Sequence, residues 1–115
     1  FLDYIKNSVL VAHHAAFDVA MINNALKRLG LPKLKNKVLD TGHLFQKSGL
    51  DTSKIHFSLD ELSTRFQIPL HDRHTASGDA YITAQLFLKI VSKLNGRQNI
   101  KLKDLARPIR RDGLI

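Results

Sequence analysis

The pattern of apolar and polar positions divides the chain into short strands and amphipathic helices. An uninterrupted apolar run over residues 9–12 predicts a short strand buried in a parallel sheet. From Phe17 onwards, apolar residues recur at helical spacing, which predicts a helix over residues 17–29. This helix is expected to stop at Gly30, because glycine is common just after helix C-termini and Pro32 prevents continuation.

The second half of the chain predicts one more strand and three helices. Residues 38–39 form a second short apolar run, and the segment 40–47 that follows predicts a short helix. Ser58 and Glu61 have the spacing of a capping box, which predicts a helix beginning at this point. A last helix is expected from residue 75 or 76 to about residue 94.

This order of elements predicts an α/β fold rather than a helical bundle. Strands that alternate with helices are typical of parallel sheets, although two strands are too few for an ordinary sheet. The chain contains no internal repeat and no low-complexity tract. Residues 1–94 are therefore expected to form part of one domain, and residues 95–115 a basic C-terminal tail or edge element.

Composition narrows the class of partner. The 115 residues carry a formal net charge of +8, which favours polyanions, and nucleic acid is the commonest of these. An anionic membrane is disfavoured because no amphipathic segment sets Lys and Arg against a Trp/Phe-rich face, and no apolar run could span a bilayer. Because there is no cysteine, any metal must bind to oxygen or imidazole. The sequence lacks a secretory leader pattern and is expected to be cytoplasmic.

Two aspartates stand at the heads of apolar helical stripes. Asp18 and Asp79 each begin a series at helical offsets, so each carboxylate is expected to point toward the edge of a core. An inward carboxylate is costly unless it is paired, capped or bound to a metal, and a shared Mg²⁺ or Mn²⁺ site is the interpretation favoured over two first-turn acids. The stripe residues are Met21, Ile22, Ala25 and Leu29 after Asp18, and Ile82, Thr83, Leu86, Ile90 and Leu94 after Asp79.

His74 precedes Asp79 by five residues, so the two side chains would not share a helix face. A histidine in the turn before the helix is instead expected to reach over the metal pocket from the side. Its imidazole is suited to take a proton from water near neutral pH. The alternative is a solvated surface histidine, and the neighbouring carboxylates favour the catalytic interpretation.

Two segments resemble the motifs of a known nuclease family. The stretch "VAHHAAFDVAMINNAL" is similar to the second motif, His-Asn-Ala-x-Phe-Asp, of the DnaQ-like, DEDD-type 3′ to 5′ exonucleases. The stretch "HTASGDAYITA" is similar to the third motif, His-x-Ala-x-x-Asp-Ala, of the histidine subclass, which includes the proofreading epsilon subunit of bacterial DNA polymerase III. The segments "VLDT" and "SLDELSTRFQIPL" also match in order and spacing, so the resemblance covers about residues 5–94.

The resemblance implies a ribonuclease H-like fold and metal-dependent phosphodiester hydrolysis. It assigns Asp18 and Asp79 as metal carboxylates and His74 as the general base, and it places Phe17 and the turn His13–His14 beside the nucleotide. The implied cofactor is a pair of Mg²⁺ or Mn²⁺ ions, and the implied substrate is the 3′ end of single-stranded nucleic acid, with DNA favoured over RNA. The implied partner is a polymerase.

The sequence departs from the family pattern in two places. His14 stands where the motif has asparagine, and no Asp-x-Glu, the first motif of the family, occurs in the 115 residues. The chain is therefore expected to be the C-terminal portion of such a domain, with two of four metal carboxylates, and to be nearly inactive alone. An open sheet edge near Val11, with dimerisation or swapping, is a further expectation.

The basic residues outside these motifs have two interpretations. Lys33, Lys35 and Lys37 are interpreted as a solvated linker in preference to a DNA contact, whereas the tail arginines are candidates for phosphate contacts. These arginines are Arg107, Arg110 and Arg111.

Two rival functions remain open at this stage. One is a metal phosphohydrolase of the HD type, suggested by the adjacent pair His71-Asp72 but without convincing partners elsewhere in the sequence. The other is a non-catalytic module that binds nucleic acid or protein and retains the nuclease fold. The first motif would distinguish the exonuclease from both.

Overall fold

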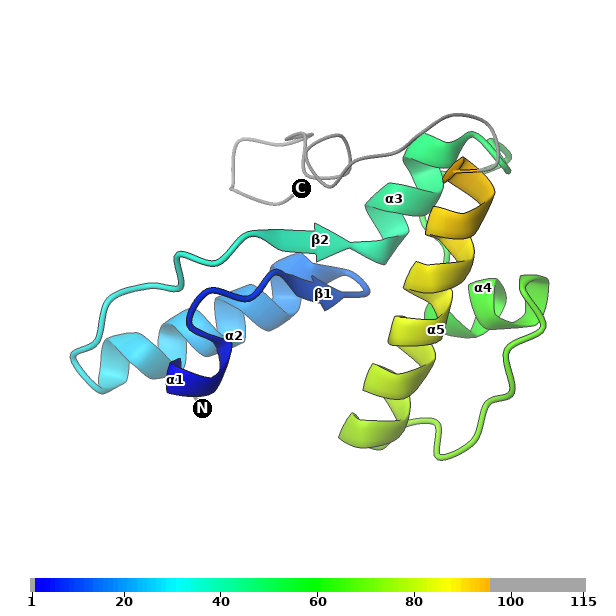
Figure 1. Ribbon diagram of the computed structural model, residues 1–115. Coiled ribbons are helices and arrows are strands. Elements are labelled where there is room, and N and C mark those ends of the chain that lie inside the picture. Colours follow the sequence, from blue (N-terminus) through cyan, green and yellow to red (C-terminus); the bar gives the residue numbers. More distant parts are fainter. Residues whose placement is uncertain (1, 96–115) are drawn as a thin grey trace.

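The computed structural model describes residues 2–95, which form two short strands and five helices (Figure 1). The order of elements is α1 (Leu2–Ile5), β1 (Leu10–Ala12), α2 (Ala15–Arg28), β2 (Val38–Asp40), α3 (Thr41–Ser48), α4 (Leu59–Arg65) and α5 (Ala76–Asn95). The predicted α/β class is confirmed for this part of the chain.

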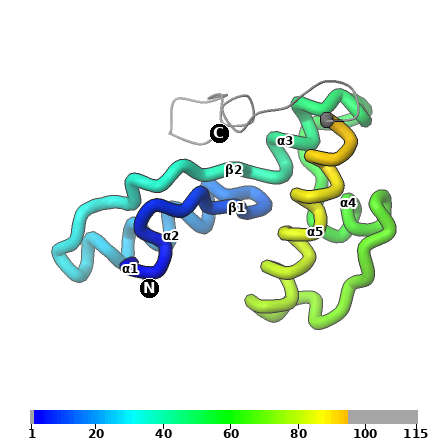
Figure 2. The backbone as a smooth tube through the Cα atoms, in the orientation of Figure 1, coloured from blue at the N-terminus to red at the C-terminus, as the bar shows by residue number. Residues whose placement is uncertain are grey.

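The two strands form a parallel sheet whose faces are covered by different helices. The register pairs Leu10 with Val38 and Ala12 with Asp40. Because side chains alternate along a strand, Leu10 and Val38 point to one face and pack with Ala15 of α2. Val11 and Leu39 point to the other face, where α3, α4 and α5 lie. Figure 2 shows the chain running from the α2 layer through β2 into this second layer.

The larger core lies on the face covered by α3, α4 and α5. It is built around fully buried side chains from all three helices, and the rings of Phe45 and Phe57 meet edge to face with centroids 5.0 Å apart. The stripe predicted for the last helix is confirmed, because Ile82, Leu86 and Ile90 are fully buried. Asp79 therefore stands at the N-terminal end of a helix that is held firmly by its apolar face.

Local stop and start signals are also confirmed. After α2 the amide of Gly30, at φ 71°, donates to Lys27 O at 3.0 Å and the amide of Leu31 donates to Leu26 O at 2.9 Å, which is a Schellman motif. At α4 the hydroxyl of Ser58 accepts from the amide of Glu61, and the Glu61 carboxylate accepts from the amide of Ser58, each at 3.0 Å.

The predicted buried stripe of the first helix is wrong. Met21 and Leu29 are 56% and 72% exposed, whereas Ala15 and Leu26 are buried. The reason is that α2 carries apolar residues on most of its circumference, so periodicity alone does not select the face that meets the sheet. The short helix α1 was not predicted, because four residues without a cap give no periodic signal.

Several expectations concern features at the limits of the described residues. Within residues 2–95 the sheet has two strands, so β1 has no second neighbour there. The expected tail, 95–115, with Arg107, Arg110 and Arg111, lies outside the described residues apart from the last position of α5. No helix in the described part is long and apolar enough to cross a membrane.

Gly78 is required by the turn that precedes α5. Its amide donates to Thr75 Oγ1 at 3.0 Å, and a Cβ built on it would lie 2.0 Å from the backbone oxygen of Asp72. We expect Gly78→Ala to lower the free energy of unfolding by about 2 kcal/mol, because the turn must shift to relieve the clash. Urea unfolding followed by circular dichroism measures this. Ser77→Ala is the control for helix propensity. Equal stability of the two variants would show that the turn does not require glycine at position 78.

Candidate active site

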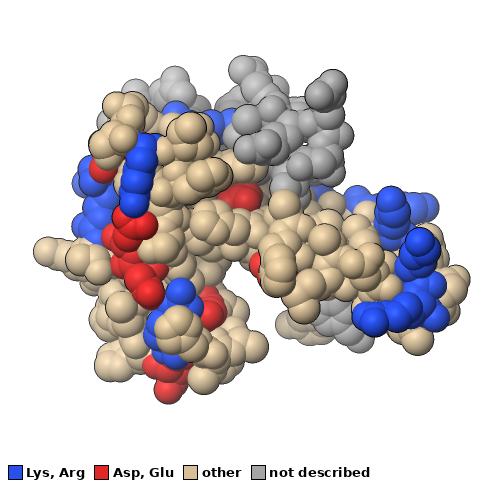
Figure 3. All heavy atoms as spheres, turned by 180° about the vertical axis from the view of Figure 1, so that it is seen from behind, with Lys and Arg blue, Asp and Glu red and all other residues tan. Residues whose placement is uncertain are grey.

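The two predicted carboxylates line the same cleft. Asp18 comes from the first turn of α2 and Asp79 from the first turn of α5, and the cleft between them has a volume of about 570 Å³. Figure 3 shows the hollow from behind, between the half that carries α2 and the half that carries α4 and α5. The other lining residues are Val11, Ala12, His13, His14, Ser58, Leu59, Arg73, Ala76, Ala80 and Thr83.

Asp40 fixes both turns that lead from the strands into this region. Its carboxylate is 2% exposed and accepts from the amides of His14 at 3.1 Å and Ala15 at 2.8 Å, at the start of α2. The same carboxylate accepts from the amide of Gly42 at 2.8 Å, so it caps the start of α3. One buried charge thus satisfies the free amides of two helix N-termini.

His13 is held by hydrogen bonds at both ring nitrogens. Its Nε2 lies 2.7 Å from the backbone oxygen of Phe57, and its Nδ1 lies 2.7 Å from Thr41 Oγ1. Because a carbonyl oxygen only accepts, Nε2 carries the proton, and the neutral ring accepts from Thr41 at Nδ1. Burial lowers the pKa of His13, which favours this neutral form. His13 therefore ties the turn after β1 to the loop before α4.

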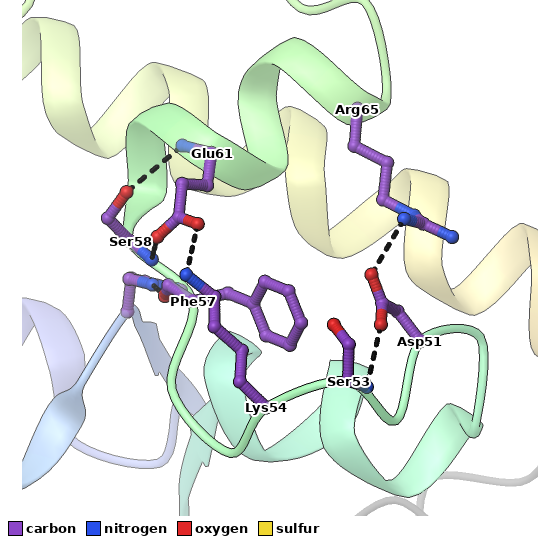
Figure 4. Close-up of polar contacts among 8 residues, drawn as sticks. Asp51, Ser53, Lys54, Phe57, Ser58, Glu61 and Arg65 are labelled. Atoms are coloured by element: carbon purple, nitrogen blue, oxygen red, sulfur yellow. Dashed lines mark hydrogen bonds and ion pairs between the residues drawn. The ribbon is translucent and has the colours of Figure 1, made fainter.

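The loop before α4 is itself anchored by side chains (Figure 4). The Lys54 ammonium pairs with Glu61 and lowers the pKa of that carboxyl to about 2. The Asp51 carboxylate pairs with Arg65 at 3.1 Å and accepts from the amide of Ser53 at 2.9 Å. These contacts are exposed and individually weak, and they lie in the loop that carries the Phe57 oxygen bound by His13.

His14 lies between two clefts and has a left-handed backbone. Its φ and ψ are both 56°, and it lines the Asp18–Asp79 cleft on one side. On the other side it lines a second cleft of about 330 Å³, together with Phe17, which is 69% exposed, and with His56. Asparagine and histidine are both enriched in this backbone region, so the departure from the motif asparagine keeps the turn geometry.

Asp18 and Asp79 differ in their electrostatic surroundings. Partial burial, with a smaller contribution from the Asp40 carboxylate, raises the pKa of Asp18. Asp79 accepts from the amide of His74 at 2.9 Å and pairs with the Arg73 guanidinium at 2.7 Å, and both contacts lower the pKa of Asp79. Arg73 also pairs with Asp60 of α4 at 2.5 Å. Asp79 thus has a cation beside it, whereas burial and the Asp40 carboxylate both raise the pKa of Asp18.

His74 lies on the exposed turn before α5, with φ 76°, and its side chain is not among those that line the cleft. The turn brings its backbone amide against Asp79, and the residue itself is exposed. His71 and Asp72 are also exposed on this turn and line neither of the two clefts. The structure therefore gives no support to the HD-type interpretation.

The described residues offer half of the ligand set that the motifs imply. Carboxylate oxygens suit hard divalent cations, but residues 2–95 contain no group of three or more acidic or histidine side chains placed to hold a metal. Moreover, both carboxylate oxygens of Asp79 already have partners in Arg73 and His74. Asp18 and Asp79 by themselves do not form a complete metal site.

The roles of two residues of the site were not predicted from the sequence. Asp40 belongs to the segment "VLDT" of the family pattern, but its role as the cap of two helices was not predicted, because its partners His14 and Ala15 are remote in sequence. Arg73 gave no signal, since it pairs with residues six positions ahead and thirteen positions behind it on different elements.

Comparison with known proteins identifies relatives over most of the chain. The family model RNase_T, described as exonuclease, matches residues 1–87. The PolC-type DNA polymerase III of Caldanaerobacter subterraneus subsp. tengcongensis is 40% identical over 106 residues, which are 92% of this chain and 7% of that protein. The PolC-type polymerase of Streptococcus sanguinis is 40% identical over 104 residues, which are 88% of this chain and 7% of that protein. No solved structure gave a significant match.

The match is to a small part of each relative. The chain spans about 7% of the length of these polymerases. Their name, PolC-type, denotes a form of DNA polymerase III distinct from the epsilon subunit that the motifs resemble.

The left-handed backbone of His14 leads to the first test of this site. We expect His14→Val to lower the free energy of unfolding by about 1–2 kcal/mol more than His14→Asn, because a β-branched residue clashes in this conformation and asparagine tolerates it. Thermal and urea unfolding of the two variants give the difference. Equal loss in both would show that the ring contacts of His14, rather than its backbone, set the stability.

The Arg73–Asp79 pair makes a second prediction. The pKa of Asp79 is depressed in the folded state, so its stabilising contacts are present above the ordinary aspartate pKa and are lost as pH falls through the lower folded value. We expect Arg73→Gln to raise the pKa of Asp79 toward its ordinary value, measured by carboxyl ¹³C NMR titration. The depression by the His74 amide should persist. Asp51→Asn removes a carboxylate that pairs with Arg65 instead and is the control. An unchanged pKa of Asp79 in Arg73→Gln would contradict the pairing.

Proposed function

Because the chain belongs to the exonuclease family described by the RNase_T model, we propose that it forms part of a metal-dependent 3′ to 5′ exonuclease domain with a ribonuclease H-like fold. Its substrate is single-stranded DNA, from whose 3′ end it releases nucleoside 5′-monophosphates. The names of the relatives, PolC-type DNA polymerase III, support a proofreading role beside a polymerase. Residues 1–94 belong to this domain, and residues 95–115 form a basic element after it.

The observation that carries the proposal is the meeting of two motif aspartates across one cleft. Asp18 and Asp79 are 61 positions apart in the sequence but head two helices whose first turns face the same hollow. The raised pKa of Asp18 is what a carboxylate shows when it lacks a neighbouring cation in a partly buried cleft.

The residues of the chain have distinct roles in the proposed reaction. Asp18 and Asp79 would hold divalent cations, Mg²⁺ or Mn²⁺, together with the carboxylates of the family's first motif, once Arg73 leaves Asp79. When bound, such cations would supply positive charge to the phosphate. His74, in the exposed turn before α5, takes the proton of the attacking water. His14 and Phe17 position the terminal nucleotide between the two clefts, and His13 fixes the turn that carries them.

Direction and cofactor can be tested in the polypeptide that contains this chain. We expect a 3′-labelled strand to lose its label at once as a mononucleotide, and a 5′-labelled strand to shorten in a ladder, only when Mg²⁺ or Mn²⁺ is present. His74→Ala should lower kcat about 10²-fold to 10⁴-fold, because proton transfer is slowed. Asp79→Asn should abolish both the activity and the binding of Mn²⁺ seen by electron paramagnetic resonance.

Asp72→Asn is the matched control, because Asp72 is an exposed aspartate on the same turn and asparagine tolerates its φ of 56°. It should retain full activity. The 115-residue chain by itself should release little or no mononucleotide, since it lacks an Asp-x-Glu motif. Activity of Asp79→Asn equal to that of the unchanged protein would refute the assignment.

The pairing of Asp79 with Arg73 favours one second candidate, a nuclease fold retained for binding alone. In that case the ion pair is permanent, and Mn²⁺ does not bind near Asp79. Mn²⁺ titration therefore separates the two candidates, because binding that disappears in Asp79→Asn supports the exonuclease, and its absence in the intact polypeptide supports the binding module.

A further inference from the structure

Six basic side chains gather at the end of the molecule opposite the cleft. They come from three segments, the residues after α1, the last turn of α2 and the linker to β2, and all six are exposed. Figure 3 shows Lys and Arg concentrated over this end without neighbouring Asp or Glu, whereas the two signs mix over the α4 and α5 half. We call these residues the basic end: Lys6, Lys27, Arg28, Lys33, Lys35 and Lys37.

The linker that carries three of these lysines is an ordered part of the fold. Its burial alternates, with Lys33, Lys35 and Lys37 exposed and the residues between them half-buried. The Asn23 side chain accepts from the amide of Leu34 at 2.9 Å.

Asn36 continues the same anchoring. Its side-chain amide donates to the backbone oxygen of Ile5 at 2.7 Å and to that of Ser8 at 2.9 Å. The exposure of the three lysines agrees with the predicted solvated linker. They are also held on one side of an extended segment, spaced by about 6.6 Å.

The charge of the basic end is not neutralised within the structure. No ion pair joins any of the six to another residue of the described range 2–95. On the other half, Lys54, Arg65 and Arg73 are each paired with a carboxylate. A row of unpaired cations with regular spacing is suited to track a chain of phosphates.

We propose that the basic end binds the phosphate backbone of the DNA strand whose 3′ end occupies the cleft, several nucleotides upstream. This inference rests on the proposed function. The 14 residues of α2 place Lys27 and Arg28 about 20 Å from the start of that helix at the cleft, since an α-helix rises about 1.5 Å per residue. A strand must therefore exceed a few nucleotides to reach both, and a dinucleotide in the cleft cannot touch the basic end.

The binding experiment uses the full chain without metal and a twenty-residue oligothymidylate. The test variant is Lys33→Gln with Lys35→Gln, and the matched control is Lys89→Gln with Lys93→Gln, which removes the same charge from exposed positions on α5. We expect the test variant to bind several-fold more weakly. The slope of log affinity against log salt should become shallower by about 1.4, because each phosphate contact contributes about 0.7. The control should keep the original slope.

A second measurement separates this inference from the proposed function. In the active polypeptide, kcat/KM for a twenty-residue strand should fall in the test variant, while kcat/KM for a dinucleotide stays unchanged. If the polypeptide hydrolyses neither substrate, the proposed exonuclease function is refuted. The binding experiment then still tests whether the basic end binds DNA.

Three results would overturn the inference. One is an unchanged salt slope in the test variant, and another is an equal loss in the control, which would indicate general charge attraction. The third is loss of binding to phosphatidylglycerol vesicles without loss of binding to the oligothymidylate, which would assign the basic end to a membrane surface.

Discussion

The fold around the cleft depends on the buried carboxylate of Asp40. Two parallel strands end side by side, and each must turn into a helix whose first amides lack partners. The Asp40 carboxylate accepts hydrogen bonds from the first amides of both helices, so one residue stabilises the turn after β1 and the turn after β2. The same charge lies close enough to raise the pKa of Asp18. The residue that stabilises the two turns therefore also influences the charge of the cleft.

Local signals allowed much of this arrangement to be predicted from the sequence. The cap of α4 and the end of α2 each involve residues within five positions of one another, so both can be recognised from local sequence. The face of α2 was not predictable in the same way. Apolar residues surround that helix, and only the direction of the preceding turn, set by Asp40, selects Ala15 and Leu26 for burial.

The cleft itself was only partly accessible to sequence reasoning. The motifs indicated that Asp18 and Asp79 belong together, and the structure brings both to one hollow. Their unequal charge environments depend on Arg73, whose partner on α4 no spacing rule connects to it. The guanidinium and the His74 amide together hold the carboxylate of Asp79 in place.

The tight turn at Gly78 bears on how such motifs are read. In the motif His-x-Ala-x-x-Asp, residue 78 is one of the positions at which any amino acid is allowed, yet the carbonyl of Asp72 leaves no room there for a methyl group. In this chain the motif therefore constrains one more position than the three that it specifies. A search profile or mutant library that allows any residue at position 78 would include sequences that cannot form the turn.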